Sequence, residues 1–271
     1  MHQIPIDDRL PELDIALRAA IEAGDAILGI YEENYETSTK QDNSPITEAD
    51  LKSNEIIKKI LSTTQHQILS EEDKDDKSRL SKETIWIVDP LDGTSDFIDK
   101  TGEFTVMIAL VKNKQPILGV IAWPTEKTIF AAQKGKGAFR YSNEEWRKIS
   151  VTEISDLQNC RAVGSRHHLS DKEKMFIEKL GIKNFTSIGS SLKVGKISSG
   201  EAEAYITTTN KMKEWDSAAS HCIISEAGGK MTDMNGNEIT YNNEIVNHQN
   251  GILVTNSLIH NKIVEEFKKL D

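Results

Sequence analysis

The sequence predicts a layered α/β protein whose two halves pack as one unit. Residues 1–60 carry helical patterns of apolar residues, whereas residues 67–141 are typical of successive β-strands. Beyond residue 150 strands and helices alternate, which favours a parallel or mixed sheet covered by helices. No internal repeat and no low-complexity linker separates the halves. We therefore expect an N-terminal half over residues 1–150 and a C-terminal half over residues 151–271.

Composition and charge narrow the class of protein. The 271 residues include 43 acidic and 33 basic side chains, a net charge of −10, so there is no basic footprint for a nucleic-acid polymer. The first residues lack the apolar core of a signal peptide, and no apolar run is long enough to cross a bilayer. Cys160 and Cys222 are too far apart for a zinc motif or a disulfide framework. We expect a soluble intracellular protein with two buried thiols.

Two amphipathic helices should open the chain. Apolar residues recur at helical spacing from Leu10 to Tyr31, after aspartates and a proline. A second helix is expected behind Thr47, which is a good N-cap residue. Asp50 then lies in the first turn, where an acid by itself compensates the helix dipole.

The stretch from Ile85 to Ile98 is expected to organise the chain. Residues 85–88 predict a buried strand closed by Pro90, and Gly93 permits a tight turn that Thr94 or Ser95 can cap. Asp89 and Asp92 at the end of this strand would repel each other unless a cation lay between them. This stretch alone predicts a hard divalent cation beside a small anion pocket.

The remaining elements follow from patterns of the same kind. Residues 67–72 predict a strand that ends in Glu71, and the polar run 73–82 predicts a solvated loop. In the N-terminal half we expect strands at 103–112, 117–123, 128–133 and 138–141, with the middle two forming a hairpin. In the C-terminal half we expect strands at 161–164, 185–188, 204–206 and 252–255, and helices at 171–180, 189–200, 215–227 and 258–270.

Four acids stand out because each lies at the end of a strand or the start of a helix. They are Glu71, Asp89, Asp92 and Asp216. Taken alone, Glu71 would be a surface residue and Asp216 a helix cap. Together they form the set of oxygen ligands that Mg²⁺ prefers, with sites left for water and phosphate.

These motifs resemble the inositol monophosphatase superfamily of Mg²⁺-dependent, lithium-sensitive phosphomonoesterases. The resemblance covers residues 10–256 and depends on the segments 45–50 (PITEAD), 70–72 (SEE), 86–94 (WIVDPLDGT) and 215–219 (WDSAA). Within the superfamily the chain is most similar to 3′(2′),5′-bisphosphate nucleotidases of the CysQ type, through the segments 165–168 (SRHH), 187–193 (SIGSSLK), 200–205 (GEAEAY) and 228–237 (GGKMTDMNGN). The family implies an αβαβα layered sandwich.

The resemblance also implies the roles of residues in the N-terminal half. Two or three Mg²⁺ ions would be held by Glu71, Asp89, Asp92 and Asp216 and by the main-chain carbonyl of Leu91. Asp50 and Thr94 would orient and deprotonate the attacking water. Backbone N–H groups of Gly93 and Thr94 would hold phosphate oxygens.

The C-terminal half is expected to select the substrate. Lys193 and Ser190 are candidates for a distal 5′-phosphate, and Ser165 and His168 for the body of the nucleotide. Some relatives carry an arginine shortly after the equivalent of Tyr205, where this chain has residues 206–209 (ITTT). If the distal phosphate needs a second cation, Lys211 or Lys213 must supply it.

The function expected is therefore removal of the 3′-phosphate from adenosine 3′,5′-bisphosphate or its sulfated analogue by metal-activated water. One alternative is a phosphatase of the same superfamily that acts on inositol phosphates or sugar bisphosphates. Another is a metal-binding regulatory protein without turnover. We further expect a cytoplasmic monomer or homodimer, with a peripheral location at the inner membrane as an alternative, and no nucleic-acid partner.

Overall fold

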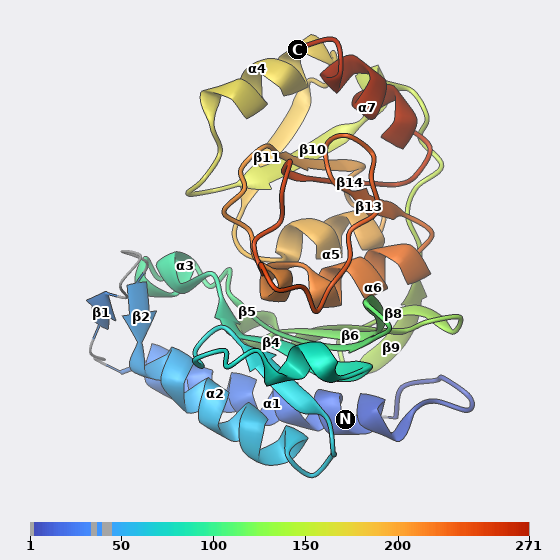
Figure 1. Cartoon of the computed structure of the whole chain (residues 1–271). Coiled ribbons are helices and arrows are strands. Elements are labelled where there is room, and N and C mark those ends of the chain that lie inside the picture. Colours follow the sequence, from blue (N-terminus) through green and yellow to red (C-terminus); the bar gives the residue numbers. More distant parts are fainter. Residues whose placement is uncertain (1–2, 34–36, 40–44, 271) are drawn as a thin grey trace.

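The computed structural model describes residues 3–33, 37–39 and 45–270 as five stacked layers. Figure 1 shows two helices below a large sheet, two helices between the large sheet and a smaller one, and two helices above the smaller sheet. This αβαβα order confirms the fold class predicted from the sequence.

The large sheet contains seven strands in the order β3-β4-β5-β6-β7-β8-β9. Only the β3–β4 pair is parallel, and the other neighbours form an antiparallel meander. The strands are β3 (Gln67–Ser70), β4 (Thr84–Asp92), β5 (Thr105–Lys112), β6 (Gln115–Trp123), β7 (Thr128–Gln133), β8 (Gly137–Ser142) and β9 (Glu145–Ile149), with the short helices η1 (Ser78–Ser81), α3 (Thr94–Ile98) and η2 (Pro124–Glu126) between them.

Helices α1 (Pro11–Tyr31) and α2 (Glu48–Leu61) cover the lower face of this sheet. Each buries one apolar stripe, such as Leu13, Ala20 and Ile27 of α1, against the strands. A two-stranded sheet, β1 (Thr37–Thr39) with β2 (Pro45–Thr47), leads into α2.

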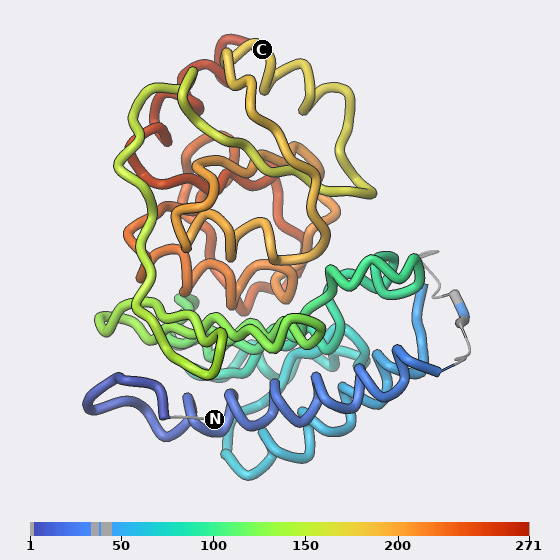
Figure 2. The backbone as a smooth tube through the Cα atoms, turned by 180° about the vertical axis from the view of Figure 1, so that it is seen from behind, coloured from blue at the N-terminus to red at the C-terminus, as the bar shows by residue number. Residues whose placement is uncertain are grey.

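The smaller sheet has five strands in the order β11-β10-β12-β14-β13. Strands β11, β10 and β12 are parallel and the others antiparallel, so the predicted parallel or mixed layer is a mixed one. Its elements are β10 (Arg161–Ser165), α4 (Asp171–Lys179), β11 (Asn184–Ile188), β12 (Ala204–Thr207), β13 (Lys230–Thr232), β14 (Ile252–Thr255) and α7 (His260–Phe267), with η3 (Leu157–Asn159) before β10. Figure 2 shows the chain rising between the two sheets along the extended yellow-green segment after β9.

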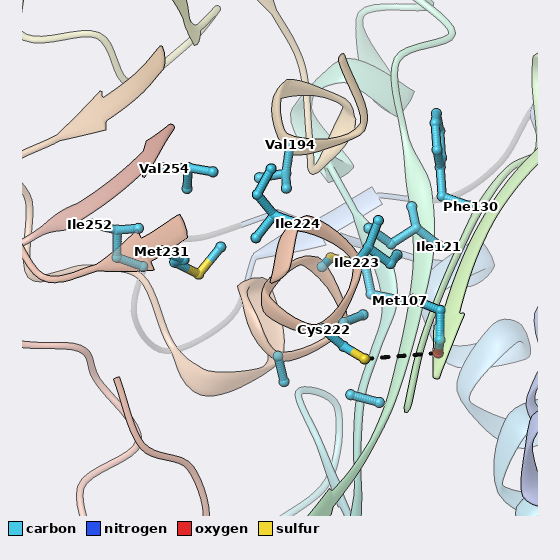
Figure 3. Close-up of a cluster of buried hydrophobic side chains, with 14 of the residues drawn as sticks. Met107, Ile121, Phe130, Val194, Cys222, Ile223, Ile224, Met231, Ile252 and Val254 are labelled. Carbon is cyan, nitrogen blue, oxygen red and sulfur yellow. Dashed lines mark hydrogen bonds between the residues drawn. The ribbon is translucent and has the colours of Figure 1, made fainter. Parts of the chain in front are cut away.

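The middle layer consists of α5 (Leu192–Ser198) and α6 (Ala218–Glu226). Side chains of α6 belong to one hydrophobic cluster with strands of both sheets, for example Met107 of β5 and Met231 of β13 (Figure 3). A Cβ at Gly119 would lie 2.5 Å from the carbonyl oxygen of Ala219, so only glycine allows α6 to pack this closely on β6. One hydrophobic cluster therefore contains residues from both halves of the chain.

Three local features differ from the predictions. Strand β4 continues past Pro90 to Asp92, because the register against β5 shifts between Asp89 and Asp92 and no ladder hydrogen bond from the proline nitrogen is required. Asp216 belongs to a separate 3₁₀ turn, η4 (Glu214–Asp216), which precedes α6. Strands β9 and β13 were not predicted.

The prediction of a fully solvated loop over residues 73–82 is wrong at Arg79. This side chain is 2% exposed and lies in η1. Its guanidinium group donates from Nε and Nη2 to Asp75, with the shorter contact at 2.8 Å. Elsewhere both cysteines are buried thiols, as expected, and none of the helices in the described ranges is long and apolar enough to cross a membrane.

Candidate active site

A cavity of about 1080 Å³ opens where the large sheet, the middle helices and the small sheet meet. Eleven of the residues proposed from the sequence line it. They are Glu71, Asp89, Leu91, Asp92, Gly93, Thr94, Ser165, His168, Ser190, Lys193 and Asp216. Asp50 lies behind this wall, where it is 1% exposed and contacts Thr94. The fold thus gathers into one site residues that are up to 166 positions apart (50 to 216) in the sequence.

Three carboxylates converge at one end of the cavity. The parallel register of β3 and β4 pairs Ser70 with Val88, so the next residues, Glu71 just after β3 and Asp89 within β4, lie side by side. Asp216 reaches the same point from η4. Each of the three acids offers an oxygen within 4.8 Å of the others. This disposition of oxygen donors fits a hard divalent cation.

Each of two carboxylates is fixed by a backbone donor. Asp89 Oδ1 accepts the N–H of Leu91 at 3.0 Å, and Asp216 Oδ2 accepts the N–H of Lys213 at 2.7 Å. Burial and the nearby charge of Glu71 raise the pKa of Asp89 and of Asp216 well above the ordinary carboxyl value. The site is therefore electrostatically strained until positive charge arrives.

Asp92 has a different environment from these three acids. Its Oδ2 accepts the N–H of Ser191 at 2.5 Å and lies 3.4 Å from Thr105 Oγ1. Burial raises the pKa of Asp92, while the charge of Lys193 opposes this increase. Asp92 thus joins the metal end of the cavity to the loop before α5, and its assignment as a metal ligand stays a prediction.

Asp50 uses its two oxygens for different contacts. Oδ2 accepts both the N–H and the hydroxyl of Thr47, at 2.7 and 2.6 Å, as part of a capping box at the start of α2. Oδ1 lies 3.1 Å from Thr94 Oγ1, which is also 3.3 Å from the carbonyl oxygen of Leu91. Asp50 is therefore both the helix-capping acid and a partner of the cavity hydroxyl.

Gly93 makes the turn between β4 and α3 possible. Its φ of +95° lies in the left-handed region, and a Cβ there would lie 3.1 Å from the Glu103 carbonyl oxygen and 3.2 Å from Ser190 Cβ. The backbone of this turn consequently faces the cavity without a side chain in the way.

Positive charge lines the same cavity. Lys193 is 8% exposed, and its Nζ lies 5.4 Å from the ring centroid of Tyr205 and 2.5 Å from the Ser190 carbonyl oxygen. Lys211 also lines the cavity. Burial lowers the pKa of His168, and the charges of His167, Lys193 and Lys211 add to that effect. Acidic and basic groups thus share one cavity, and we refer to the carboxylate cluster as its acidic end and to Lys193 and Lys211 as its basic end.

Two sets of contacts that the sequence did not reveal hold the site together. Arg79 Nη1 donates to Asn242 Oδ1 at 2.8 Å, and Nη2 donates to the carbonyl oxygen of Asn243 at 2.9 Å. Glu214 in turn accepts the N–H groups of Asn242 and Asn243, each at 2.8 Å. This network ties the segment after β3 to the turn that carries Asp216. Glu103, the second such residue, contacts Arg166 and the backbone of Gly189.

Comparison with known proteins places these features in a family. The profile of the Inositol monophosphatase family matches residues 8–271. The 3′(2′),5′-bisphosphate nucleotidase CysQ of Escherichia coli strain K12 is 36% identical over 234 residues, which cover 84% of this chain and 93% of that protein.

Solved structures agree with this result. The crystal structure of CysQ from Bacteroides thetaiotaomicron has a TM-score of 0.78 and 34% identity, and the match covers 90% of this chain and 96% of that one. The inositol monophosphatase of Anabaena has a TM-score of 0.77 and 27% identity, with 95% of both chains covered.

The electrostatic strain at the acidic end predicts a pH-dependent effect of Mg²⁺ on stability. The pKa values of Asp89 and Asp216 are raised in the folded state. The free energy of unfolding therefore decreases as the pH rises and these acids ionise. Mg²⁺ at a hundredfold excess over its Kd should add about 2.7 kcal/mol, or about 5 °C in Tm, at pH 7.5, and less at pH 5.

Thermal unfolding followed by circular dichroism, with and without Mg²⁺, measures this effect. Asp89→Asn should unfold no earlier than the wild type without Mg²⁺ and should lose most of the Mg²⁺ increment, whereas the exposed control Glu126→Gln should keep it. An equal increment in Asp89→Asn and wild type would contradict a metal site at these acids.

Proposed function

The chain belongs to the inositol monophosphatase family, and we propose that it is a 3′(2′),5′-bisphosphate nucleotidase. It removes the 3′-phosphate from adenosine 3′,5′-bisphosphate and releases AMP and phosphate. The CysQ relatives, at 34–36% identity over most of both chains, support this activity. The chain's own residues support it independently.

The observation that carries the proposal is that one cavity is lined both by a carboxylate cluster and by lysines. A phosphate bound through a cation suits the cluster formed by Glu71, Asp89 and Asp216. A second phosphate suits Lys193 and Lys211. A substrate with one phosphate uses only the carboxylate cluster, whereas a nucleotide with two phosphates uses both sets of residues.

The acidic end is proposed to hold two or three Mg²⁺ ions. Glu71, Asp89, Asp92 and Asp216, with the carbonyl oxygen of Leu91, are the ligands. Mg²⁺, when bound there, supplies positive charge that lowers the pKa of water and stabilises the leaving oxygen. The same acids also line the part of the cavity that receives the scissile phosphate, and the N–H groups of Gly93 and Thr94 complete it.

Thr94 and Asp50 are proposed to orient the attacking water and take its proton. Thr94 Oγ1 lies within hydrogen-bond distance of Asp50 Oδ1, and its lone pairs remain available to a water in the cavity. As the water attacks phosphorus, its proton moves to Thr94 Oγ1 while the threonine proton moves to Asp50. Buried behind the wall, Asp50 is kept in place by its contacts with Thr47.

The C-terminal half is proposed to recognise the rest of the nucleotide. Ser190 and Lys193 receive the 5′-phosphate, and Ser165 and His168 contact the nucleoside. Lys211 supplies the second cation in place of the arginine that some relatives carry, since its charge already acts on His168. In this role the enzyme clears the by-product of sulfate activation and sulfotransfer.

A substrate panel with purified protein and Mg²⁺ tests the proposed function. Phosphate release from adenosine 3′,5′-bisphosphate should exceed that from inositol 1-phosphate by at least about tenfold in kcat/KM, because one charge-assisted contact at the basic end is worth roughly that much. Faster turnover of inositol 1-phosphate, or of a sugar bisphosphate, would contradict it. No phosphate release from any member of the panel would favour a regulatory metal-binding protein.

Replacement of Thr94 tests the proposed proton path. Thr94→Ala should lower kcat by about 100-fold or more with little change in KM, because the hydroxyl acts on water rather than on the nucleotide. Thr94→Ser, which keeps the hydroxyl, should recover part of the loss. Steady-state kinetics at saturating Mg²⁺ measures both variants, and wild-type kcat in Thr94→Ala would remove this residue from the mechanism.

A further inference from the structure

We infer that Glu103 is a positioning residue that helps to select the substrate. It holds both recognition segments of the C-terminal half against the segment that follows the turn at Gly93 and Thr94. The inference rests on the proposed function. Glu103 is not among the residues that line the cavity, so its action is indirect. Here the first recognition segment is residues 165–168, and the second is residues 189–193.

One carboxylate oxygen of Glu103 binds both segments. Its Oε2 accepts Arg166 Nη2 at 2.6 Å and the backbone N–H of Gly189 at 2.6 Å. Arg166 belongs to the first segment, between Ser165 and His168, whereas Gly189 begins the second segment, which carries Ser190 and Lys193. Two short charge-assisted hydrogen bonds to one oxygen fix the spacing between these two segments.

Asp96 reinforces the same contact from α3. This carboxylate is 2% exposed, and its Oδ1 lies 3.3 Å from Arg166 Nε, 3.4 Å from His167 Nε2 and 2.8 Å from Thr101 Oγ1. A Cβ at Gly189 would lie 2.5 Å from Asp96 Oδ2, so the second segment passes here only as glycine. Both halves of the protein therefore meet at this point without intervening space.

Asp96 and Glu103, which belong to the N-terminal half, lie close to the turn at Gly93 and Thr94. Asp96 is two residues after Thr94, and Glu103 immediately precedes Phe104, whose Cα lies 3.4 Å from a Cβ built at Gly93. Asp96 and Glu103 thus link the position of the two recognition segments to the position of the scissile phosphate. The negative charges of Asp96 and Glu103 also oppose the lowering of the pKa of Lys193 by burial, which helps to keep that lysine cationic.

If Glu103 only positions the nucleotide, its replacement should impair the turnover of some substrates and not others. A general loss of structure would impair the turnover of all substrates. A small phosphate ester such as p-nitrophenyl phosphate needs only the acidic end of the cavity. Adenosine 3′,5′-bisphosphate needs the two recognition segments as well. Removing the Glu103 contact should therefore impair the large substrate alone.

The experiment compares the two substrates in Glu103→Gln at saturating Mg²⁺. We expect KM for adenosine 3′,5′-bisphosphate to rise about tenfold or more, with kcat/KM for p-nitrophenyl phosphate within about twofold of wild type. Glu201→Gln is the matched control, because Glu201 forms an ion pair with Arg140 at 2.9 Å away from the cavity, and it should leave both substrates unaffected.

Arg166→Gln breaks the same ion pair from the other side and serves if Glu103→Gln does not fold. It should raise the same KM, and the double variant should lose less than the product of the two single losses. Equal losses on both substrates, or unchanged KM for the bisphosphate, would overturn the inference. If wild type itself prefers inositol 1-phosphate, the proposed function fails instead, so the two failures are distinguishable.

Discussion

Repulsion among buried carboxylates is the constraint on which this structure depends. Glu71, Asp89 and Asp216 lie at the junction of the two sheets, where burial and the charge of Glu71 raise the pKa of Asp89 and of Asp216. The fold nevertheless fixes them there, through the parallel β3–β4 pair and through the 3₁₀ turn before α6. Such a site costs free energy in the absence of a cation, and it is stable because the surrounding layers are well packed. Metal binding and stability are consequently linked.

Contacts between the two halves keep this junction rigid. Arg79 and Glu214 are joined through the backbone of residues 242–243, which ties the Glu71 side of the site to the Asp216 side. Glu103 performs a similar task beside the Gly93 turn, where it binds the recognition segments. The middle helices pack between the two sheets, with α6 against glycine on β6. Residues from both halves thus form the walls of one cavity.

Much of this site could be predicted from the sequence because local signals mark its residues. Strand ends, helix starts and the family motifs identified the residues that line the cavity, and the N-cap Thr47 placed Asp50. Arg79 escaped prediction because it lies in a polar run that indicated a solvated loop, and its partner Asn242 is distant in the sequence. Glu103 escaped because its partners Arg166 and Gly189 are equally distant. The continuation of β4 beyond Pro90 depends on a register shift against β5, which no local pattern reveals. Local sequence patterns thus do not predict the contacts of charged residues with partners that are distant in the sequence.

One cavity is proposed to bind both phosphates of the nucleotide, one at its carboxylate cluster and one at its lysines. A crystal structure of the protein with adenosine 3′,5′-bisphosphate and Ca²⁺, a cation chosen to bind without rapid turnover, tests it most directly. We predict the 3′-phosphate beside Glu71, Asp89 and Asp216, and the 5′-phosphate in a hydrogen bond to Lys193 Nζ. A nucleotide bound in the reverse direction, or a 5′-phosphate directed into solvent away from Lys193, would contradict the claim.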